Sequence, residues 1–365
     1  MNEKSRKSVV LVGGGHTHAL VLNGLKSAPL DGAHVTVINP GKTAPYSGML
    51  PGFVAGHYRR DELDIDLAAL SRKVGATLID GKAVGLDPER RIVRLEDGTD
   101  IAYDFASIDI GITSRMDALA GFSDHGVPAK PLGNFSIEWD KFRGSEGDKH
   151  VAILGGGIAG AELAMAMAFA LQSDKSQVAV KLLDRSKILS TNSEKAQARL
   201  RKELSANGVE VLEDVGVVEA TPRGLTLTDG GLIQANFVVG AAGATPHAWV
   251  AESGLAITDG FIDVNKALQT SAPDVFAVGD CAHMTFDPRP KAGVYAVRQA
   301  PVLLRNIRKS LVGEPLDTYQ PQSDYLKLVS LGSKRAFGEK MGFGAAGHLI
   351  WWLKHRIDQS FMKQF

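Results

Sequence analysis

The sequence predicts an α/β protein built from two similar units, one of them inserted in the other. Two glycine-rich turns carry this prediction, at 13–15 and 155–160; each follows a short apolar run and opens a helical stretch. An apolar run that leads through glycines into a helix is typical of a buried parallel strand in a doubly wound sheet. Backbone N–H groups at such a helix N-terminus bind a diphosphate, and glycine lets the ligand approach the main chain. The pair of turns therefore indicates two Rossmann-like dinucleotide-binding domains.

The first unit follows this plan through a run of alternating segments. Its expected elements are, in order, strand 8–12, helix 16–26, strand 34–38, an irregular Gly/Pro-rich stretch at 39–56, strands between 77 and 95, and a strand that ends at Gly111. Turn residues at 96–99 separate the short strands.

The second unit repeats the plan after a polar stretch at 143–149, which marks a domain crossing. Its expected elements are strand 151–154, a helix to 171, strand 178–184, a strand–turn–strand at 225–231 and strand 237–243. A last strand stops at Gly279-Asp280 and precedes a helix at 293–308. We expect one discontinuous domain (1–145 and 256–320), an inserted domain (146–255), and a small C-terminal segment (321–365) with an amphipathic helix.

Composition limits the function. The 365 residues are enough for two domains with separate cores. The 41 Lys and Arg residues balance the 41 Asp and Glu residues, so no overall charge favours nucleic acid as a partner. No apolar segment resembles a signal peptide or a membrane span, and we expect a cytoplasmic protein. Cys281 is the only cysteine, which excludes an internal disulfide and a cysteine-pair relay; no metal site is expected.

The first turn departs from the dinucleotide-binding pattern. Gly13 and Gly15 are in place, but His18 replaces the third glycine, so we expect a splayed helix or a ring directed toward the cofactor. The alternative is that His16 and His18 only begin the helix. Asn39 replaces the acid that normally binds the ribose, and it can bind a hydroxyl without charge.

The second turn is complete, with Gly155, Gly157 and Gly160 at the required spacing. Asp184 ends the next strand, where a carboxylate would accept hydrogen bonds from the ribose and repel a 2′-phosphate. NADH is therefore favoured, although Arg185 could pair with that phosphate and permit NADPH.

Together these motifs resemble the two-dinucleotide-binding-domain flavoproteins of the pyridine nucleotide-disulfide oxidoreductase superfamily. The shared features cover nearly the whole chain and include both turns, the strand end at 108–111, and the segments 241–246 and 270–280. The resemblance implies FAD in the first and last parts and NAD(P)H in the inserted part. It also implies that Asp280 binds the ribityl chain of the flavin; the alternative is a helix N-cap or turn aspartate.

The absence of cysteines from the segment 41–52 limits the branches of this superfamily to which the chain can be similar. Disulfide reductases carry a cysteine pair, and persulfide reductases one cysteine, in the region that corresponds to 41–52, where this chain has none. The remaining resemblance is to type II NADH:quinone oxidoreductases and to NADH-dehydrogenase-like flavoproteins found alone or fused to selenide, water dikinase. This resemblance rests on the sequence segments 13–18, 46–52 and 293–299. Cys281 is expected to be a buried filler.

The resemblance also implies site residues. The catalytic set is Glu162, Tyr46 and Pro51; Glu162 stands where the quinone reductases place a glutamate near nicotinamide and quinone, with helix-dipole stabilisation as its alternative role. The helix start near Val297 is expected to stabilise negative charge on the flavin. The cofactor-binding set is Gly13, Gly15, His16, Asn39, Lys42, Val84, Gly111, Gly279, Asp280, Val297, Gly155, Gly157, Gly160, Asp184 and Gly243.

The end of the chain, 348–365, is predicted as a helix with an apolar arc, made of Ile350, Leu353, Ile357, Phe361 and Phe365. Lys354 lies at the edge of this arc, and Asp358 is expected on the opposite, polar face with Arg356, Gln359 and Lys363. Tryptophans beside a basic, apolar helix suit a membrane–water interface at the inner face of the cell membrane, where a quinone is reached. The alternative is packing on the chain's own domains or on a second copy in a homodimer.

The predicted function is that of an FAD-dependent NAD(P)H dehydrogenase. It would pass hydride from NADH to FAD and electrons to a quinone-like acceptor without a cysteine relay. One alternative is a soluble flavin reductase for a protein or a selenium or sulfur partner, in association with a selenide, water dikinase. Another is a non-catalytic flavin-binding sensor or interaction module.

Overall fold

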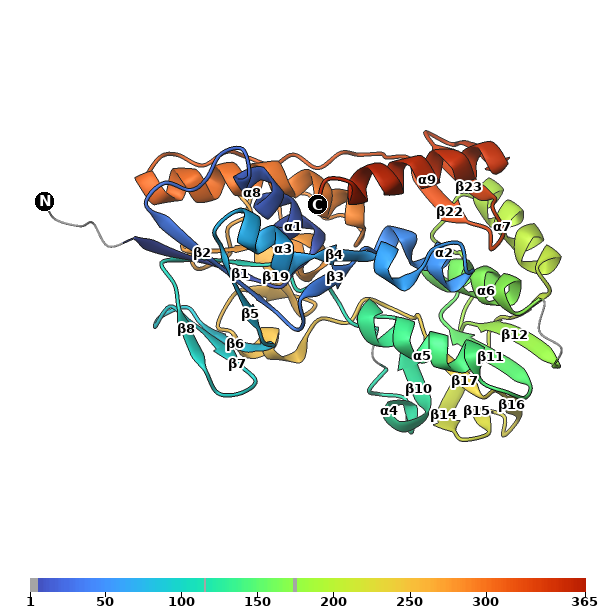
Figure 1. Cartoon of the computed structure of the whole chain (residues 1–365). Coiled ribbons are helices and arrows are strands. Elements are labelled where there is room, and N and C mark those ends of the chain that lie inside the picture. Colours follow the sequence, from blue (N-terminus) through green and yellow to red (C-terminus); the bar gives the residue numbers. More distant parts are fainter. Residues whose placement is uncertain (1–5, 115, 173–175) are drawn as a thin grey trace, which may run out of the picture.

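The computed structural model of the chain describes residues 6–114, 116–172 and 176–365. Two doubly wound units lie side by side, and a C-terminal segment runs along both of them (Figure 1). Residues 1–5, part of the N-terminus in which no signal peptide is expected, lie outside the described residues.

The first unit is a parallel five-stranded sheet covered by helices. Its strands are, in spatial order, β20 (Val275–Ala277), β9 (Phe105–Ile108), β1 (Lys7–Val12), β2 (Ala33–Asn39) and β5 (Thr77–Asp80). The central strand β1 is buried from Val9 to Val12, as expected for a parallel strand covered on both faces. Helix α1 (His16–Leu25) packs against α8 (Gly293–Val312) and α3 (Leu67–Lys73). Because β20 returns from late in the chain to pair with β9, the second unit is an insertion.

The second unit repeats this sheet. Its strands are, in spatial order, β10 (Gly126–Pro128), β17 (Phe237–Gly240), β11 (Lys149–Leu154), β12 (Val178–Leu183) and β13 (Val209–Leu212), all parallel. Its helices are α4 (Phe122–His125), α5 (Leu132–Gly144), α6 (Ile158–Leu171) and α7 (Glu194–Ala206). Strand β10 and helices α4 and α5 all precede residue 146, the predicted start of this unit. Three residues at a sheet edge carry no apolar run from which such a strand could be predicted.

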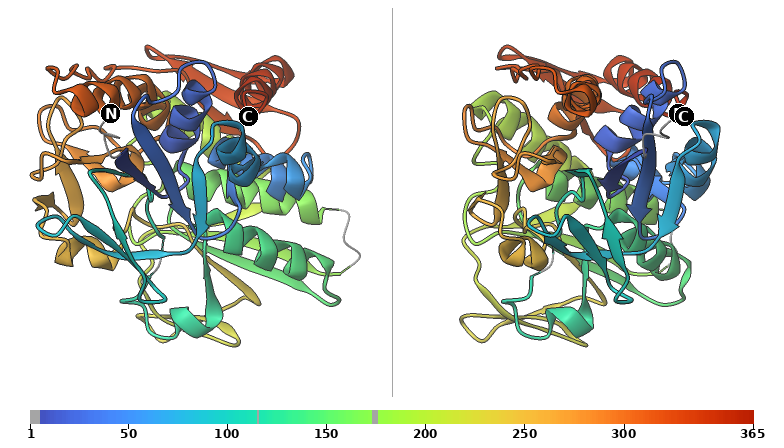
Figure 2. Two further views of the ribbon diagram at one scale, coloured as in Figure 1. Left: turned by 60° about the vertical axis from the view of Figure 1, so that its left-hand side comes forward. Right: turned by 90° about the vertical axis from the view of Figure 1, so that its left-hand side faces the viewer.

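The chain crosses between the units twice, and the two crossings touch. Thr113 and Thr245 form an isolated antiparallel bridge, with both N–H···O distances at 2.9 Å. Figure 2 shows the molecule from two further sides, with the C-terminal segment (red) at the top in both views.

Smaller sheets complete both units. An antiparallel sheet follows at equivalent places in each: β6 (Ala83–Asp87), β7 (Ile92–Leu95) and β8 (Asp100–Ala102) in the first, and β14 (Val217–Thr221), β15 (Gly224–Leu227) and β16 (Leu232–Gln234) in the second. This repetition agrees with the repeated strand–turn–strand pattern of the sequence. The remaining short elements are β3 (Thr43–Pro45), α2 (Leu50–Val54), β4 (Asp64–Asp66), β18 (Ile257–Thr258), β19 (Phe261–Val264) and β21 (Ala282–Met284).

The C-terminal segment is an antiparallel sheet followed by a helix. The sheet consists of β22 (Lys327–Ser330), β23 (Ala336–Lys340) and β24 (Phe343–Gly347), and helix α9 (His348–Met362) follows directly. Val329 and Phe337 belong to the core around α6, whereas Phe361 of α9 packs into the core of the first unit. The segment therefore spans both units.

Candidate active site at the two glycine turns

The first glycine turn is held by Asn39 at the end of β2. Gly13 has φ at +91°, and a Cβ there would lie 2.4 Å from the backbone oxygen of Asp109, so only glycine fits. The side-chain oxygen of Asn39 accepts the N–H of Gly14 at 2.9 Å. The Asn39 amide nitrogen donates to the carbonyls of Pro40 and Gly41 at 3.2 and 3.0 Å. Asn39, predicted as a ribose ligand, is thus already engaged in shaping the turn.

His18, at the third glycine position, is a structural residue. Its ring is completely buried and bridges the carbonyl of Gly13, 2.7 Å from Nδ1, and the hydroxyl of Ser107, 2.8 Å from Nε2. Burial lowers the pKa of His18 to about 4, so the ring is neutral at physiological pH. The predicted alternative of a ring directed toward the cofactor is not seen, because the ring is buried between the helix and the sheet.

The equivalent helix of the second unit approaches its sheet more closely. A Cβ at Gly160 would lie 1.9 Å from the carbonyl oxygen of Gly155, so no side chain fits there. Since His18 has a Cβ at the same position of the first turn, α1 must stand farther from its turn than α6 does. The prediction of a splayed first helix is consistent with this contrast.

The second turn is held in the same way as the first, but by a charged residue. Asp184 accepts the N–H of Gly156 at 2.6 Å with one oxygen, and the N–H and hydroxyl of Ser186, both at 2.8 Å, with the other. At Gly157, the N-cap of α6, an added Cβ would meet no atom within 4 Å. This open cradle at an uncapped helix N-terminus fits the diphosphate of a dinucleotide.

Asp280 lies at the opposite rim of the first turn. The N–H of Gly279, which has φ at +68°, donates to the buried side chain of Gln299 at 2.7 Å, and this bond fixes the turn that presents Asp280. Lys130 forms an ion pair with Asp280 at 3.1 Å. Burial lowers the pKa of His16 to about 4, against the opposing charge of Asp280. His16, Lys130 and Asp280 therefore gather at the start of α1.

Aromatic rings extend this site toward α9. Tyr46 stacks on Phe361 with ring centroids 4.5 Å apart, and His16 lies 5.2 Å from the Tyr46 ring. The Tyr46 hydroxyl donates to Asp358 at 3.2 Å, and burial raises its pKa. Pro51, the other predicted residue of this loop, is buried in the first turn of α2.

A polar cluster of Glu162, Lys354 and Asp358 joins α6 to α9. Lys354 and Asp358 are both buried; the ammonium donates to Asp358 at 2.7 Å and to the carbonyl of Gly48 at 2.6 Å. Glu162 accepts the N–H of Ser330 at 2.6 Å. Burial raises the pKa of Glu162 to about 7, while the positive charge of Lys354 opposes the rise. Burial likewise raises the pKa of Asp358.

The predicted faces of α9 were partly wrong. Lys354 and Asp358, expected at the edge and on the polar face, are buried, and Leu353 and Ile357 of the predicted apolar arc are exposed. The physical reason is that Lys354 and Asp358 are four residues apart and neutralise each other, so they can turn inward together. Sequence periodicity alone assigns such a pair to solvent.

The remaining predicted cofactor residues lie in several different elements. Gly111 and Gly243 follow equivalent strands, with φ at +65° and +69° and no atom within 4 Å of an added Cβ. Val84 is half-buried in β6, and Lys42 is exposed. Val297 lies in the second turn of α8, which begins at Gly293, so the free N–H groups at that helix start are earlier in the chain.

Cys281 is a buried thiol beside the first site. It is 3% exposed, and its sulfur lies 3.2 Å from the carbonyl of Val278. Burial raises its pKa to about 12, which keeps it protonated and unreactive. Its position agrees with the expectation of a buried filler.

Sequence reasoning missed Asp109 as a site residue. It follows β9 at the position that Ala241 occupies after β17 in the second unit. The backbone N–H of Asp109 donates to the carbonyl of Val12, and that of Ala241 donates to the carbonyl of Leu154, both at 2.8 Å. The Asp109 carboxylate is buried beneath Gly15 and Gly279, where an added Cβ would lie 2.3 and 2.5 Å from it. The available signal was the difference between Asp109-Ile110-Gly111 and Ala241-Ala242-Gly243, the equivalent strand end of the second unit.

The chain is similar in sequence to several known reductases and dehydrogenases. A probable ferredoxin reductase, CtmF, of Castellaniella defragrans is 27% identical over 86% of this chain and 77% of its own length. The NADH dehydrogenase-like protein YutJ of Bacillus subtilis is 25% identical over 91% of this chain and 92% of its own length. The match to the nitric oxide reductase FlRd-NAD(+) reductase of Aeromonas salmonicida, at 31% identity, spans 54% of this chain and only 50% of that relative.

The fold is also that of solved flavoprotein reductases. The sulfide:quinone oxidoreductase of Aquifex aeolicus superposes with a TM-score of 0.80 at 17% identity, over 98% of this chain and 91% of that one. The family model for pyridine nucleotide-disulphide oxidoreductases matches residues 7–300, a range that contains both turns and Asp280. The chain therefore belongs to the pyridine nucleotide-disulphide oxidoreductase family, whose members are NAD(P)H-dependent flavoprotein oxidoreductases with FAD as cofactor.

Proposed function

We propose that this protein oxidises NADH and reduces a quinone-like acceptor, with no cysteine relay between flavin and acceptor. The observation that carries the proposal is the cluster of half-buried Glu162 with buried Lys354 and Asp358 on the inner side of α9, while Leu353 and Ile357 are exposed on its outer side. The cluster supplies charge and a titratable proton, and the apolar face supplies a surface that an apolar acceptor can reach. The sole thiol, Cys281, is buried and protonated.

The residues of the first turn fit FAD. Gly13 and Gly279 have positive φ angles, and an added Cβ at either would lie within 2.5 Å of Asp109. The helix N-terminus of α1 suits a diphosphate, and Asp280 can accept hydrogen bonds from ribityl hydroxyls. We assign the nicotinamide nucleotide to the open cradle at Gly157, with Asp184 at its rim. When bound, the flavin supplies hydride acceptance and electron release, and the protein supplies orientation and exclusion of water.

Glu162 and Lys354 act on the proton balance at the acceptor. Reduction of a quinone to a quinol requires two protons, and a carboxyl with a pKa of about 7 can hold one near neutral pH. The fixed positive charge of Lys354, held by Gly48 and Asp358, stabilises negative charge that develops beside it. Tyr46 and Pro51 hold the loop that carries Gly48.

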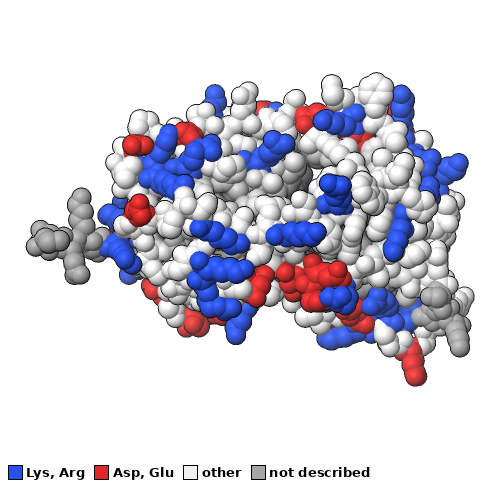
Figure 3. Space-filling view, turned by 45° about the horizontal axis from the view of Figure 1, so that its top comes forward, with Lys and Arg blue, Asp and Glu red and all other residues white. Residues whose placement is uncertain are grey.

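The membrane surface is the proposed location of the acceptor. None of the helices in the described ranges has the length and apolarity needed to cross a bilayer. The C-terminal segment instead exposes large apolar side chains in its hairpin and along α9, where Leu349, Trp352, Leu353 and Ile357 have the spacing of one helix face. Basic side chains border an uncharged area at this end of the molecule (Figure 3). Trp352 beneath the guanidinium of Arg356, 5.5 Å from the ring, is typical of a membrane–water interface.

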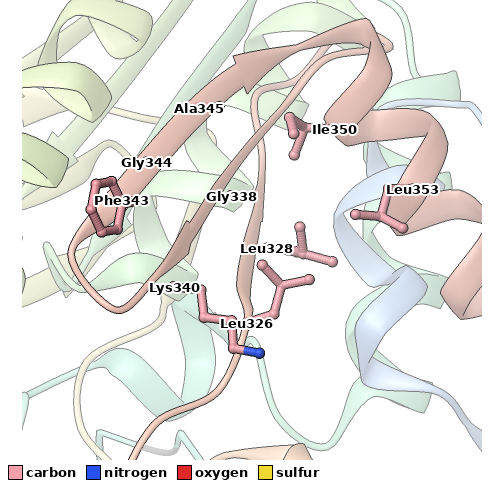
Figure 4. A pocket seen from close by; sticks show the side chains of 9 residues that line it. All are labelled: Leu326, Leu328, Gly338, Lys340, Phe343, Gly344, Ala345, Ile350 and Leu353. Carbon is pink, nitrogen blue, oxygen red and sulfur yellow. The ribbon is translucent and has the colours of Figure 1, made fainter.

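A hollow of about 230 Å³ opens on the same face. Leu326, Leu328 and Ile350 line it between the C-terminal sheet and α9, with Phe343 at the hairpin and the ammonium of Lys340 nearby (Figure 4). An almost wholly apolar lining suits a hydrocarbon chain, either that of a lipid or the tail of a quinone.

A rapid-mixing experiment tests the reaction. Anaerobic NADH should bleach the flavin absorbance, and a short-chain soluble quinone should restore it at rates of about 1–1000 per second. The panel of acceptors also includes a ferredoxin-type protein and selenite, because a soluble reductase for a protein or a selenium partner is the alternative function. Flavin that stays oxidised under NADH would overturn both readings, whereas reoxidation by the carrier protein alone would favour the alternative.

Binding to liposomes tests the membrane surface. The double variant Leu353→Ser/Ile357→Ser should lose co-sedimentation with anionic vesicles, while Val218→Ser/Leu232→Ser, which alters similarly exposed apolar side chains on the second unit, should retain it. Equal binding by both variants would contradict the proposal. If the first variant instead converts a dimer to a monomer without affecting liposomes, α9 is a homodimer surface. An association with a selenide, water dikinase stays a prediction, which mixing with that enzyme would test.

A further inference from the structure

Asp109 supplies the N-terminal cap that α1 lacks. Gly15, the N-cap residue of α1, has no side chain to accept the N–H groups of the first turn. The carboxylate of Asp109, from the end of β9, accepts the N–H of His18 at 3.1 Å and also receives the N–H of Thr17. A negative side chain therefore occupies the positive end of the helix that, in this family, faces the diphosphate of FAD.

This arrangement places two anionic groups at one helix end. A carboxylate that is 4% exposed is poorly screened, so its charge would oppose the binding of a diphosphate on the same N-terminus. The second unit avoids the conflict because Ala241 stands at the equivalent position. The first unit can avoid it only if Asp109 is neutral when FAD is bound.

We propose that Asp109 takes up one proton from solvent when FAD binds, so that the affinity for FAD falls as the pH rises above neutrality. The structure provides a hydrogen-bond acceptor for the protonated carboxyl group. The hydroxyl of Thr17, which contacts Asp109, donates its own hydrogen to the carbonyl of Ala296 at 3.0 Å. Its oxygen can therefore accept a hydrogen bond from protonated Asp109, while the other carboxyl oxygen keeps the N–H of His18.

The surrounding groups leave Asp109 as the residue that titrates here near neutral pH. Burial, reinforced by the negative charge of Asp280, raises the pKa of Asp109 to about 7. On α1, His16 and His18 have pKa values lowered to about 4 and stay neutral. Next to Asp280, which is paired with Lys130, Cys281 has its pKa raised to about 12 and stays protonated. Lys291, which faces Cys281, has a lowered pKa because of burial.

The sign of the effect follows from linkage. Below pH 7 Asp109 is protonated with or without FAD, and the Kd is constant. Above pH 7 binding requires proton uptake, so the Kd for FAD rises by up to about tenfold per pH unit until the higher pKa of the FAD-bound protein is reached.

Titration of the apoprotein with FAD, followed by flavin fluorescence from about pH 6 to pH 9, measures this slope. We expect the full-length wild-type protein to bind FAD about 10- to 100-fold more weakly at the upper end than at the lower. Asp109→Asn keeps the shape and the oxygen that accepts from His18, and its Kd should stay constant within about twofold. Glu162→Gln removes the other carboxyl with a pKa near 7 and should retain the wild-type slope. A slope that persists in Asp109→Asn, or no slope in the wild type, would overturn the proposal.

Calorimetry gives a second readout that needs no variant. At about pH 8, the FAD-binding enthalpy in two buffers of different ionisation enthalpy reports the number of protons taken up. We expect a substantial fraction of one proton per FAD; none would refute the inference even if Asp109→Asn failed to fold. The inference rests on the FAD site alone. Both measurements read FAD binding, so their outcome is separate from that of the quinone proposal.

Discussion

The two nucleotide-binding units share one backbone plan but differ in what lies beneath the glycine turn. In the first unit His18 and Asp109 fill the space between helix, turn and sheet with hydrogen-bonded side chains. In the second, Gly160 and Ala241 stand at the equivalent positions, and the space above Gly157 is open. The first turn is therefore stabilised from within, whereas the second depends on close backbone packing. A cofactor that stays and a substrate that exchanges are expected to need these two kinds of site.

The strongest way to break this comparison is to add one carbon to the second turn. In Gly160→Ala the new Cβ would lie 1.9 Å from the carbonyl of Gly155, so α6 must move and distort the cradle at Gly157. We expect a loss of at least about 3 kcal/mol in the free energy of unfolding of the second unit, or at least a 100-fold rise in the NADH concentration needed to reduce the flavin. FAD content should be unchanged. The matched variant His18→Ala should have the opposite pattern, with weaker FAD binding and an intact NADH site; equal effects on both cofactors would contradict the separation of the two turns.

A smaller effect is expected from Glu162, which stands on α6 where α1 has Leu20. Because burial raises the pKa of Glu162 to about 7, the residue is a proton donor below that pH and a carboxylate above it. The rate of flavin reoxidation by a quinone should therefore fall as the pH rises through about 7. Glu162→Gln should reduce that rate by about 10- to 100-fold and remove the inflection, as measured by double-mixing kinetics that start from reduced flavin. Flavin reduction by NADH serves as the internal control, and an unchanged inflection would point to another group.

The smallest effect concerns the residues that hold the second glycine of each turn. Asp184→Asn keeps an oxygen for the N–H of Gly156 but removes the charge that repels a 2′-phosphate, and the exposed Arg185 remains available. The preference for NADH over NADPH, as a ratio of kcat/KM, should fall by about tenfold, equivalent to about 1.4 kcal/mol. The reciprocal change Asn39→Asp in the first turn should leave this ratio unaltered. A preference that does not move in Asp184→Asn would mean that Asp184 serves only to shape the turn.

The sequence was sufficient for the architecture because its signals are local. Each glycine turn followed by a helix marks a place where the backbone can approach a ligand. The strands that end at Gly111, Gly243 and Gly279-Asp280 mark further such places, and a short stretch of sequence is enough to recognise each of them. Strand β20 pairs with β9, which brings the strand that leads to Asp280 into the sheet of the first turn; the role of Asp280 in binding the flavin stays a prediction. The predicted burial of Cys281 is confirmed.

The features that sequence analysis missed depend on contacts between a charged side chain and a distant part of the chain. The burial of Asp109 is compensated by the N–H groups of α1 that donate to its carboxylate. Without them, a buried carboxylate at the end of a strand would be unfavourable. Lys354 and Asp358 are buried because each neutralises the other and Gly48 offers a carbonyl. An argument from hydrophobic periodicity considers each charged residue alone and predicts that it is exposed to solvent. Such compensations are visible only in three dimensions.

The two crossings at Thr113 and Thr245 have a mechanical consequence. Two bridged strands form a hinge, and a hinge alone would let the units rotate against each other. The C-terminal segment adds a third connection, since β23 packs with the core around α6 and Phe361 with the core of the first unit. Because α2 of the first unit also packs against α6 of the second, contacts at several places hold the two units in one arrangement. The spacing between the two nucleotide sites is then a fixed dimension of the scaffold, and we expect substrate exchange to occur through local loops rather than through opening of the molecule.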